Sequence, residues 1–413
     1  MIRESGKNVF AYNLSFLALL CAFSIDLFTY GYPGKLFYLV SYVAIFYTFV
    51  YFYQNRRALN LDKPALYFFI TLLLVGLSRL VWSWHFKQTH YEDIRDNYAL
   101  GGKRFVIAAF LLFYFYQYRA LLLRSVLKLG IGVMFIGMAI SLWYGHVTPE
   151  PLTHRAQWTS DAATTGAYLV VIYAMATIVA VRACYKDSGF SILLFSLVFL
   201  LTMGMILMTE TRSAILLTPL IFAAFFIYYY RSVSLKIQLA LALVIVLAAS
   251  SVVYFSWNRI SQIGSDIAEY NTNNATSIGA RFSMWGAGIH SISPDMLGQT
   301  VDSRYAKALD YIDNSERANP AAKSNVAYHL HNDLLDTFSL QGIFGFISLA
   351  LFFIAGFYFS LRRNALQNYG TFFILLPIFI LGLADTVLIQ SNTVLMVIMA
   401  LALSFPVMNK PRV

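Results

Sequence analysis

Twelve continuous apolar segments run along this chain of 413 residues. Most of them are about 20 residues long, the length that a helix needs to cross a lipid bilayer. Only helices and closed barrels span lipid, because every backbone polar group must find a partner within the protein, and segments that are apolar throughout favour helices over alternating barrel strands. We therefore predict an all-α polytopic membrane protein with spans near residues 11–30, 36–54, 64–84, 104–118, 127–145, 163–181, 190–209, 213–230, 237–256, 338–360, 370–388 and 392–408.

The composition supports this class. Hydrophobic residues make up 59% of the chain and charged residues only 12%, whereas a soluble domain has about 25% charged residues. The two cysteines, Cys21 and Cys184, lie in or beside apolar segments, which gives no basis for a disulfide framework or a thiolate metal site. The first apolar segment has no clear cleavage site and many spans follow it, so we expect it to be retained.

The basic residues between the spans predict the orientation. On one side, the chain ends and short connections carry 16 Lys or Arg residues, and the short connections on the other side carry 7. The positive-inside rule therefore places both termini in the cytoplasm. The larger set is Arg3, Lys7, Arg56, Arg57, Lys63, Arg119, Arg124, Lys128, Arg182, Lys186, Arg231, Lys236, Arg362, Arg363, Lys410 and Arg412, and the smaller is Lys35, Lys87, Arg95, Lys103, Arg104, Arg155 and Arg212.

This orientation predicts three parts. Residues 1–256 hold the first nine spans, residues 257–337 form an outer loop with the candidate catalytic motif, and residues 338–413 hold three more spans and a short cytoplasmic tail. The loop carries six basic and nine acidic residues, too mixed a charge for an arm that binds nucleic acid. Its segments SWNRISQIGSDIAEY and RFSMWGAGIHSI predict helices, the second ended by Pro294. We therefore expect a structured loop, in the periplasm if the cell is Gram-negative.

The segment HLHNDLLDTF, residues 329–338, places histidines just before a span. His331, Leu334, Leu335 and Phe338 follow the spacing of one helical face, which predicts a helix that continues into the span near residue 338. His329 and His331 would point in different directions on a helix or a strand, so we expect no metal at this pair. An alternative to catalysis is that His331 only caps or hydrogen-bonds within the loop.

Two arginines are candidates for binding an anion. Arg212 is the only basic residue of a tight outer turn that also holds Glu210, although an arginine at this depth is commonly an interfacial side chain that reaches for water. Arg281 and Trp285 lie four residues apart on one face of the second loop helix. A structural contact of guanidinium on indole is an equally good interpretation of that pair.

Charged residues within the apolar segments form another candidate group. Asp26, Arg79 and Asp385 are costly in lipid unless they are paired or face a polar cavity. Asp385 is a candidate site residue because its span follows the span that begins with the histidine segment. Asp26 and Arg79 are predicted to form an ion pair between two spans.

These residue types are suited to one chemistry. Arginine binds phosphate oxygens with two parallel hydrogen bonds and stays charged, so Arg212 and Arg281 are suited to hold a lipid pyrophosphate and stabilise it as a leaving group. Histidine has an ordinary pKa of about 6.5, so His331 is suited to accept a proton from an attacking sugar hydroxyl. This scheme requires no metal and no cofactor.

Three motifs resemble those of the bacterial O-antigen ligases, within a wider group that includes O-antigen polymerases and protein O-oligosaccharyltransferases. The family has a His followed by Asn, Ser or Gln, nine variable residues, Gly, two residues, and Gly, Thr or Tyr. His331, Asn332, Gly342 and Gly345 match it at every specified position. The turn Thr211, Arg212, Ser213 and the pattern Gly279, Arg281, Trp285 match the other two motifs.

The resemblance implies a membrane-embedded glycosyltransferase of the C type in the bacterial inner membrane. Such an enzyme moves O-antigen from undecaprenyl pyrophosphate to the lipid A-core, at the periplasmic face, without a nucleotide sugar, a metal or nucleic acid. It implies His331 as the base and Arg212 and Arg281 as pyrophosphate ligands, with supporting roles for Asn332, Trp285, Glu210 and Asp385.

Other functions remain open at this point. A polymerase or a protein O-oligosaccharyltransferase uses the same donor and differs in the acceptor. A transporter or flippase is the main competitor from another class, but internal repeats or broken spans near the bilayer midplane are expected of it. The polar groups here gather at one outer face instead, which weighs against transport.

Overall fold

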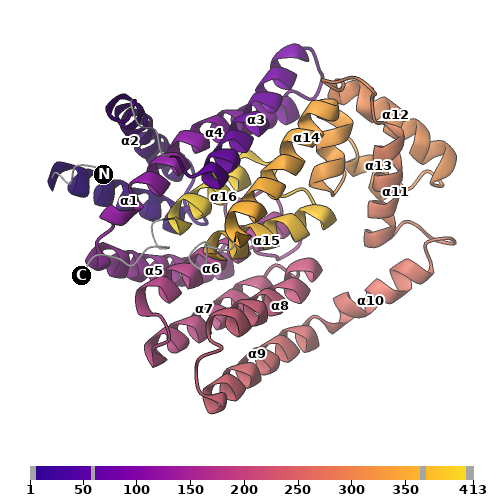
Figure 1. The fold of residues 1–413 in the computed structure, drawn as a ribbon. Coiled ribbons are helices and arrows are strands. Elements are labelled where there is room, and N and C mark those ends of the chain that lie inside the picture. Colours follow the sequence, from indigo (N-terminus) through magenta and orange to yellow (C-terminus); the bar gives the residue numbers. More distant parts are fainter. Residues whose placement is uncertain (1–5, 57–60, 363–368, 406–413) are drawn as a thin grey trace.

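The computed structural model describes residues 6–56, 61–362 and 369–405. Every regular element in these ranges is helical, which confirms the predicted all-α class (Figure 1). Ten helices are long and apolar enough to cross a membrane, and α15 and α16 are shorter apolar helices. The bounds are α1 Gly6–Ile25, α2 Tyr32–Gln54, α3 Lys63–His85, α4 Glu92–Gln117, α5 Arg124–Val147, α6 Ala163–Tyr185, α7 Gly189–Leu207, α8 Arg212–Tyr229, α9 Leu235–Phe255, α14 Asp333–Leu361, α15 Tyr369–Ala384 and α16 Ser391–Ser404, with a short 3₁₀ helix at Arg119–Leu121.

Helix α4 differs from its predicted span of residues 104–118. It begins twelve residues earlier, at Glu92, because Glu92 and Asp93 are favourable in the positively polarised first turn of a helix. The polar stretch is also buried by neighbours: Tyr98 is fully buried, and Arg104 donates a hydrogen bond to the carbonyl of Ser391. Hydropathy alone misses such a start because the extension packs on protein instead of lipid.

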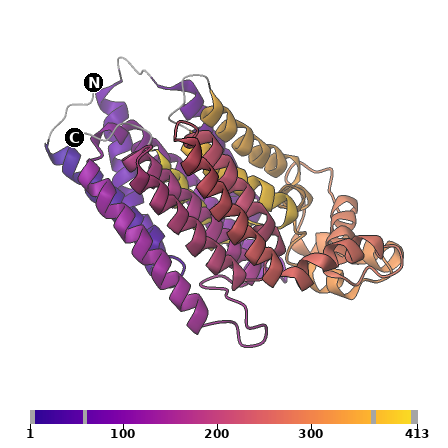
Figure 2. The ribbon, with the colours of Figure 1, turned by 90° about the horizontal axis from the view of Figure 1, so that it is seen from below.

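Helix α6 lies at the centre of the bundle and α9 at its edge. Nearly all of α6 is buried, including its tyrosines and alanines, whereas α9 buries only a few residues. Helices α5, α7, α15 and α16 pack around α6. Figure 2 shows these helices side by side, with the orange segments projecting from one end of the bundle.

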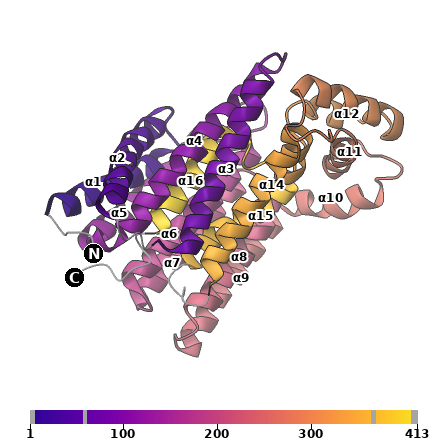
Figure 3. The same cartoon turned by 45° about the horizontal axis from the view of Figure 1, so that its top comes forward.

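Four further helices, α10 Trp257–Ala268, α11 Ser277–His290, α12 Val301–Ser315 and α13 Pro320–Asn325, form this projecting part, here called the lobe (Figure 3). Its own apolar core includes Met284, Ile312 and Leu330. A fully buried ion pair fixes it to α14, because Arg304 lies 2.8 Å from Asp336 and also donates to the carbonyl of Ala327. The helices predicted around 257 and 281 are therefore present, and the lobe is packed.

Helix α14 is broken at Gly342, where the backbone has a φ of +63° that glycine adopts readily. The break exposes backbone groups, and the loop before α12 pairs with them: Gln299 N–H donates to Leu340 C=O over 2.9 Å, and Phe344 N–H donates to Met296 C=O over 3.1 Å. A Cβ at Gly342 would lie 2.3 Å from the Asp295 carbonyl oxygen. This motif glycine thus joins the lobe to the bundle.

The predicted ion pair between Asp26 and Arg79 does not form. Arg79 donates to the carbonyl of Leu388, while Asp26 lines a separate cavity with Arg104, so this prediction is wrong. Some predicted features lie outside the described residues: Arg3, Arg57, Arg363, Lys410, Arg412, the end of the span 392–408 and the tail.

Candidate functional site

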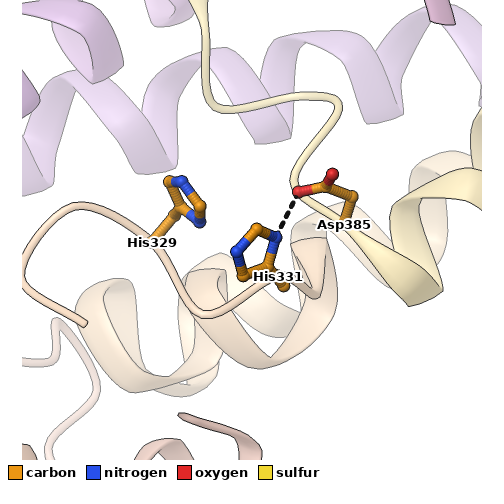
Figure 4. A group of neighbouring side chains, drawn as sticks. All are labelled: His329, His331 and Asp385. Carbon is orange, nitrogen blue, oxygen red and sulfur yellow. Dashed lines mark hydrogen bonds and ion pairs between the residues drawn. The ribbon is translucent and has the colours of Figure 1, made fainter. Parts of the chain in front are cut away.

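His331 and Asp385 form the centre of the candidate site. His331 Nδ1 lies 2.7 Å from Asp385 Oδ1, although 54 residues separate them in sequence (Figure 4). Asp385 follows the last residue of α15 and lies in the connection to α16, so it is at the end of a span and not within one. Helix α15 therefore places the Asp385 carboxylate beside His331 at the end of the span, outside the lipid.

His331 itself lies outside any helix, which corrects the predicted helical face. Its φ is +51°, and α14 begins only at Asp333. Asn332 ends the turn by capping the helix, since its side-chain oxygen accepts from Leu335 N–H over 3.0 Å. Its amide nitrogen donates to Leu383 C=O over 3.0 Å, which ties the histidine turn to the end of α15.

Asp385 is held as a charged acceptor. It accepts hydrogen bonds from Tyr168 Oη over 2.9 Å and from Thr386 N–H over 2.8 Å, besides the His331 contact. Burial raises the pKa of Asp385, but the hydrogen bond and charge of His331, with His329 and Arg281, outweigh it and hold this pKa well below its usual range. A carboxylate bonded to Nδ1–H leaves Nε2 of His331 as the proton acceptor.

His329 lies beside His331, which corrects the expectation that the two rings diverge. Their centroids are 4.3 Å apart and the rings meet edge to face (Figure 4). The left-handed turn at His331 brings them together, and neither a helix nor a strand would do so. Burial, and then the proximity of His331, lowers the pKa of His329 to about 4. One ring atom of each histidine and one oxygen of Asp385 lie within 4.8 Å of one another.

The two candidate arginines line one cavity of about 390 Å³, here called the arginine cavity. Arg212 is the first residue of α8, and Arg281 lies in the second turn of α11. Their segments meet because the lobe folds back over the start of α8. The other lining residues are Arg155, Thr164, Glu210, Thr211, Ser213, Leu216, Ile263, Ile267, Ser277, Ile278, Phe282, Trp285 and Ala384.

The arginines of this cavity differ in their present partners. Arg212 lies 3.3 Å from Asp266 and 2.7 Å from Gln262 Oε1, both on α10. Arg155 donates to Thr209 C=O over 2.6 Å. Arg281 donates to Ser277 Oγ over a long 3.4 Å, and its buried Nε has no hydrogen-bond partner. Arg281 is therefore the cavity arginine with the most hydrogen-bonding capacity left for an anion.

A second cavity of about 450 Å³, here called the polar cavity, lies on the other side of the His331 turn. Thr164 lines both cavities, and Trp285 Nε1–H donates to His331 C=O over 3.2 Å. The histidine turn therefore separates the two spaces. The polar cavity is lined by Asp93, Ile94, Asn97, Asp161, Ala162, Thr164, Thr165, Asn325, Tyr328, His329, His331, Asp385, Thr386, Ile389 and Gln390.

All seven predicted site residues thus gather at one end of the bundle. Arg212, Glu210, Arg281 and Trp285 line the arginine cavity, His331 and Asp385 line the polar cavity, and Asn332 caps α14 between α15 and the lobe. Sequence reasoning missed Tyr168, Arg155 and His329. Arg155 was weakly indicated by the sequence, since it is one of few basic residues on the predicted outer side. Nothing in the sequence indicated Tyr168, which lies in the apolar segment of α6.

Comparison with known proteins agrees with the motifs. Residues 195–350 match a family model described as O-antigen ligase. The chain is also 26% identical over 370 residues to the O-antigen ligase of Escherichia coli strain K12, covering 86% of this chain and 84% of that protein. The family match spans the end of the bundle that carries Arg212, the lobe and the His331 turn.

Proposed function

We propose, on the premise that this chain is a member of the O-antigen ligase family, that it transfers O-antigen from undecaprenyl pyrophosphate to a sugar hydroxyl of the lipid A-core. One observation carries the proposal: Arg212 and Arg281 line one cavity next to a turn that presents a histidine paired with a carboxylate. A leaving-group site and a base at adjacent positions are what a displacement at a glycosyl carbon needs.

The arginine cavity is assigned to the lipid-linked donor. Its guanidinium groups suit a pyrophosphate, and its apolar residues, such as Leu216, Ile263 and Phe282, suit a polyprenyl chain. The start of α8 adds backbone N–H groups and the positive end of the helix dipole. The pyrophosphate would replace Asp266 and Gln262 as partners of Arg212.

The polar cavity is assigned to the acceptor sugar. Carboxylate and amide side chains such as Asp93, Asn97 and Asp161 are hydrogen-bond partners for hydroxyl groups, and there is no arginine or lysine among the residues that line it in the described chain. The acceptor hydroxyl would then reach His331 from the polar cavity and meet the anomeric carbon of the donor near Thr164, which lines both cavities.

The reaction is a single displacement. The acceptor oxygen forms a bond to the anomeric carbon, and the bond from that carbon to the pyrophosphate oxygen breaks, with inversion. The electron pair leaves with the pyrophosphate, which the arginines neutralise, and the hydroxyl proton passes to His331 Nε2. Asp385 keeps His331 in the right tautomer and stabilises the imidazolium. Such a base contributes about 10² to 10⁴ in rate, and alignment of the two substrates contributes more.

The orientation follows from charge. Because the spans alternate, the starts of α8 and α14 and the end of α15 lie at the same end of the bundle as the lobe. The positive-inside rule makes that end periplasmic and places both termini in the cytoplasm. The enzyme then works at the outer face of the inner membrane, on two substrates anchored in lipid.

Deletion of the gene in a strain with smooth lipopolysaccharide tests the proposal. We expect the O-antigen ladder on lipid A-core to disappear while long polymer accumulates on the lipid carrier, and the gene on a plasmid should restore the ladder. Single O-units still attached to the core would instead identify a polymerase. Unchanged lipopolysaccharide would point to protein glycosylation or transport and would reject the proposal.

A further inference from the structure

We propose that His329, His331 and Asp385 form an inhibitory site for a transition-metal ion that prefers imidazole ligands, such as Zn²⁺. One potential ligand atom from each residue lies within 4.8 Å of the others. The expected inhibition rests on the proposed role of His331 as the base, whereas the binding itself does not.

The geometry is close to that of a three-ligand zinc site. Zinc bonds to nitrogen and oxygen are about 2.0–2.2 Å long, so tetrahedral ligand atoms lie about 3.3 Å apart. His331 Nδ1 and Asp385 Oδ1, now 2.7 Å apart, would separate slightly, and no ligand pair would need to approach by more than about 1.5 Å. The turn at 329–332 and the connection after α15 carry all three groups, so side-chain rotation in two loops brings them together. A water molecule or a substrate oxygen would take the fourth position.

The two histidines are also suited to act as ligands of a metal ion. His329 Nδ1 is buried and has no hydrogen-bond partner, so this nitrogen has gained no protein contact in exchange for leaving water. His331 already lies 2.7 Å from the Asp385 carboxylate, so one nitrogen and one oxygen ligand are in place side by side. The polar cavity gives an ion a route to the group.

Occupancy would stop the proposed reaction. The ion would replace the hydrogen bond between His331 Nδ1 and Asp385 Oδ1 by two metal–ligand bonds, and the imidazole proton would move from Nδ1 to Nε2. With Nε2 protonated, His331 would be unable to take the proton of the acceptor hydroxyl. Hard cations such as Mg²⁺ prefer oxygen ligands and octahedral geometry, so they should not bind here.

The test uses the full-length protein, purified in detergent with a tag that lacks histidine. Binding of Zn²⁺ alone is measured by calorimetry, and ligation of lipid-linked donor to lipid A-core is measured after chelation and across a Zn²⁺ titration. We expect full activity after chelation, one Zn²⁺ bound per chain, and inhibition by Zn²⁺ but not by Mg²⁺. His329→Gln should raise the Zn²⁺ concentration for half-inhibition at least tenfold, and His331→Ala should lose binding even though it is inactive.

His290→Gln is the matched control, because His290 is exposed on α11 and lies outside the group; it should keep the wild-type response to Zn²⁺. Equal inhibition of the wild type and His329→Gln would overturn the proposal. Loss of activity on chelation would also overturn it, since the metal would then be required. Failure of ligation in the untreated wild type would count against the proposed function instead, and zinc binding would still decide the site.

Discussion

The arginine cavity and the polar cavity meet at one histidine turn but differ in chemistry. The arginine cavity combines Arg155, Arg212 and Arg281 with apolar side chains, whereas the polar cavity combines carboxylates and amides with two histidines. The first suits an anionic head on a lipid tail, and the second suits an uncharged group rich in hydroxyls. Under the proposed function, the chain would therefore separate its donor from its acceptor by charge, with His331 at the boundary.

We expect the largest effect from a substitution of His331, which lies at the boundary between the two cavities. His331→Ala should lower the turnover number by about 10² to 10⁴, because it removes the proposed base, and both KM values should change little. Ligation of purified donor and acceptor by the purified variant measures this. His290→Ala serves as the control. A variant that keeps wild-type turnover would remove His331 from the mechanism and leave the two cavities without a shared function.

The next effect concerns the arginine cavity. Arg281→Ala should lower kcat/KM for the donor by about 10² to 10³, the usual cost of losing one group that stabilises a developing negative charge. Arg281→Lys should recover only part of this loss, since an ammonium cannot bind phosphate with two parallel hydrogen bonds. If acceptor KM rose and donor KM did not, the assignment of the cavities would be reversed.

A smaller effect is expected in the polar cavity. Asp161→Ala should raise acceptor KM by about tenfold, because a hydrogen bond to a charged group contributes about 1.5 kcal/mol or more. Donor KM should stay near the wild-type value, as the exposed Asp161 lines the polar cavity and does not line the arginine cavity. Initial rates at varied acceptor concentration measure the change. An effect on donor KM alone would contradict the separation by charge.

The smallest effect should come from the α10 contact. Under the proposed function, Asp266 would compete with pyrophosphate for Arg212, and their part-buried pair, with one contact of 3.3 Å, should contribute about 1 kcal/mol. Asp266→Asn should therefore lower donor KM up to about fivefold and make undecaprenyl pyrophosphate a stronger product inhibitor. Asp310→Asn, on the exposed side of α12, is the control. A higher donor KM in Asp266→Asn would show that Asp266 helps the donor instead.

A further prediction concerns the pH dependence of stability at the His331–Asp385 pair. Because the folded-state pKa of Asp385 is depressed, the stability that this carboxylate contributes is fully present above the ordinary aspartate pKa of about 3.9. It is lost only as the pH falls through the lower folded-state value. The difference in thermal unfolding between the wild type and Asp385→Asn should therefore persist as the pH falls to about 4, the ordinary aspartate pKa, and shrink only below it. A difference that already shrinks as the pH falls towards about 4 would contradict the depressed pKa.

Sequence reasoning was strongest where hydropathy and local spacing decide the structure. The apolar segments predicted the spans, and helical spacing predicted α10 and α11. It failed where long-range packing overrides local pattern. The spacing of His331 with Leu334 and Leu335 indicated one helix face, but the Asn332 cap and the left-handed turn exclude His331 from α14. Polar residues at the start of α4 were assigned to a connection because hydropathy does not register burial against protein.

The membrane class, the apolar segments and the family motifs can be read from the sequence, because the cost of placing polar groups in lipid is a local property of each segment. The folded chain was needed to show that Arg212 and Arg281 share a cavity, that Asp385 contacts His331 and that His329 lies beside His331. Those contacts join residues many turns apart in the chain. They depend on how the broken α14 and the buried Arg304–Asp336 pair seat the lobe on the bundle, which no local pattern encodes.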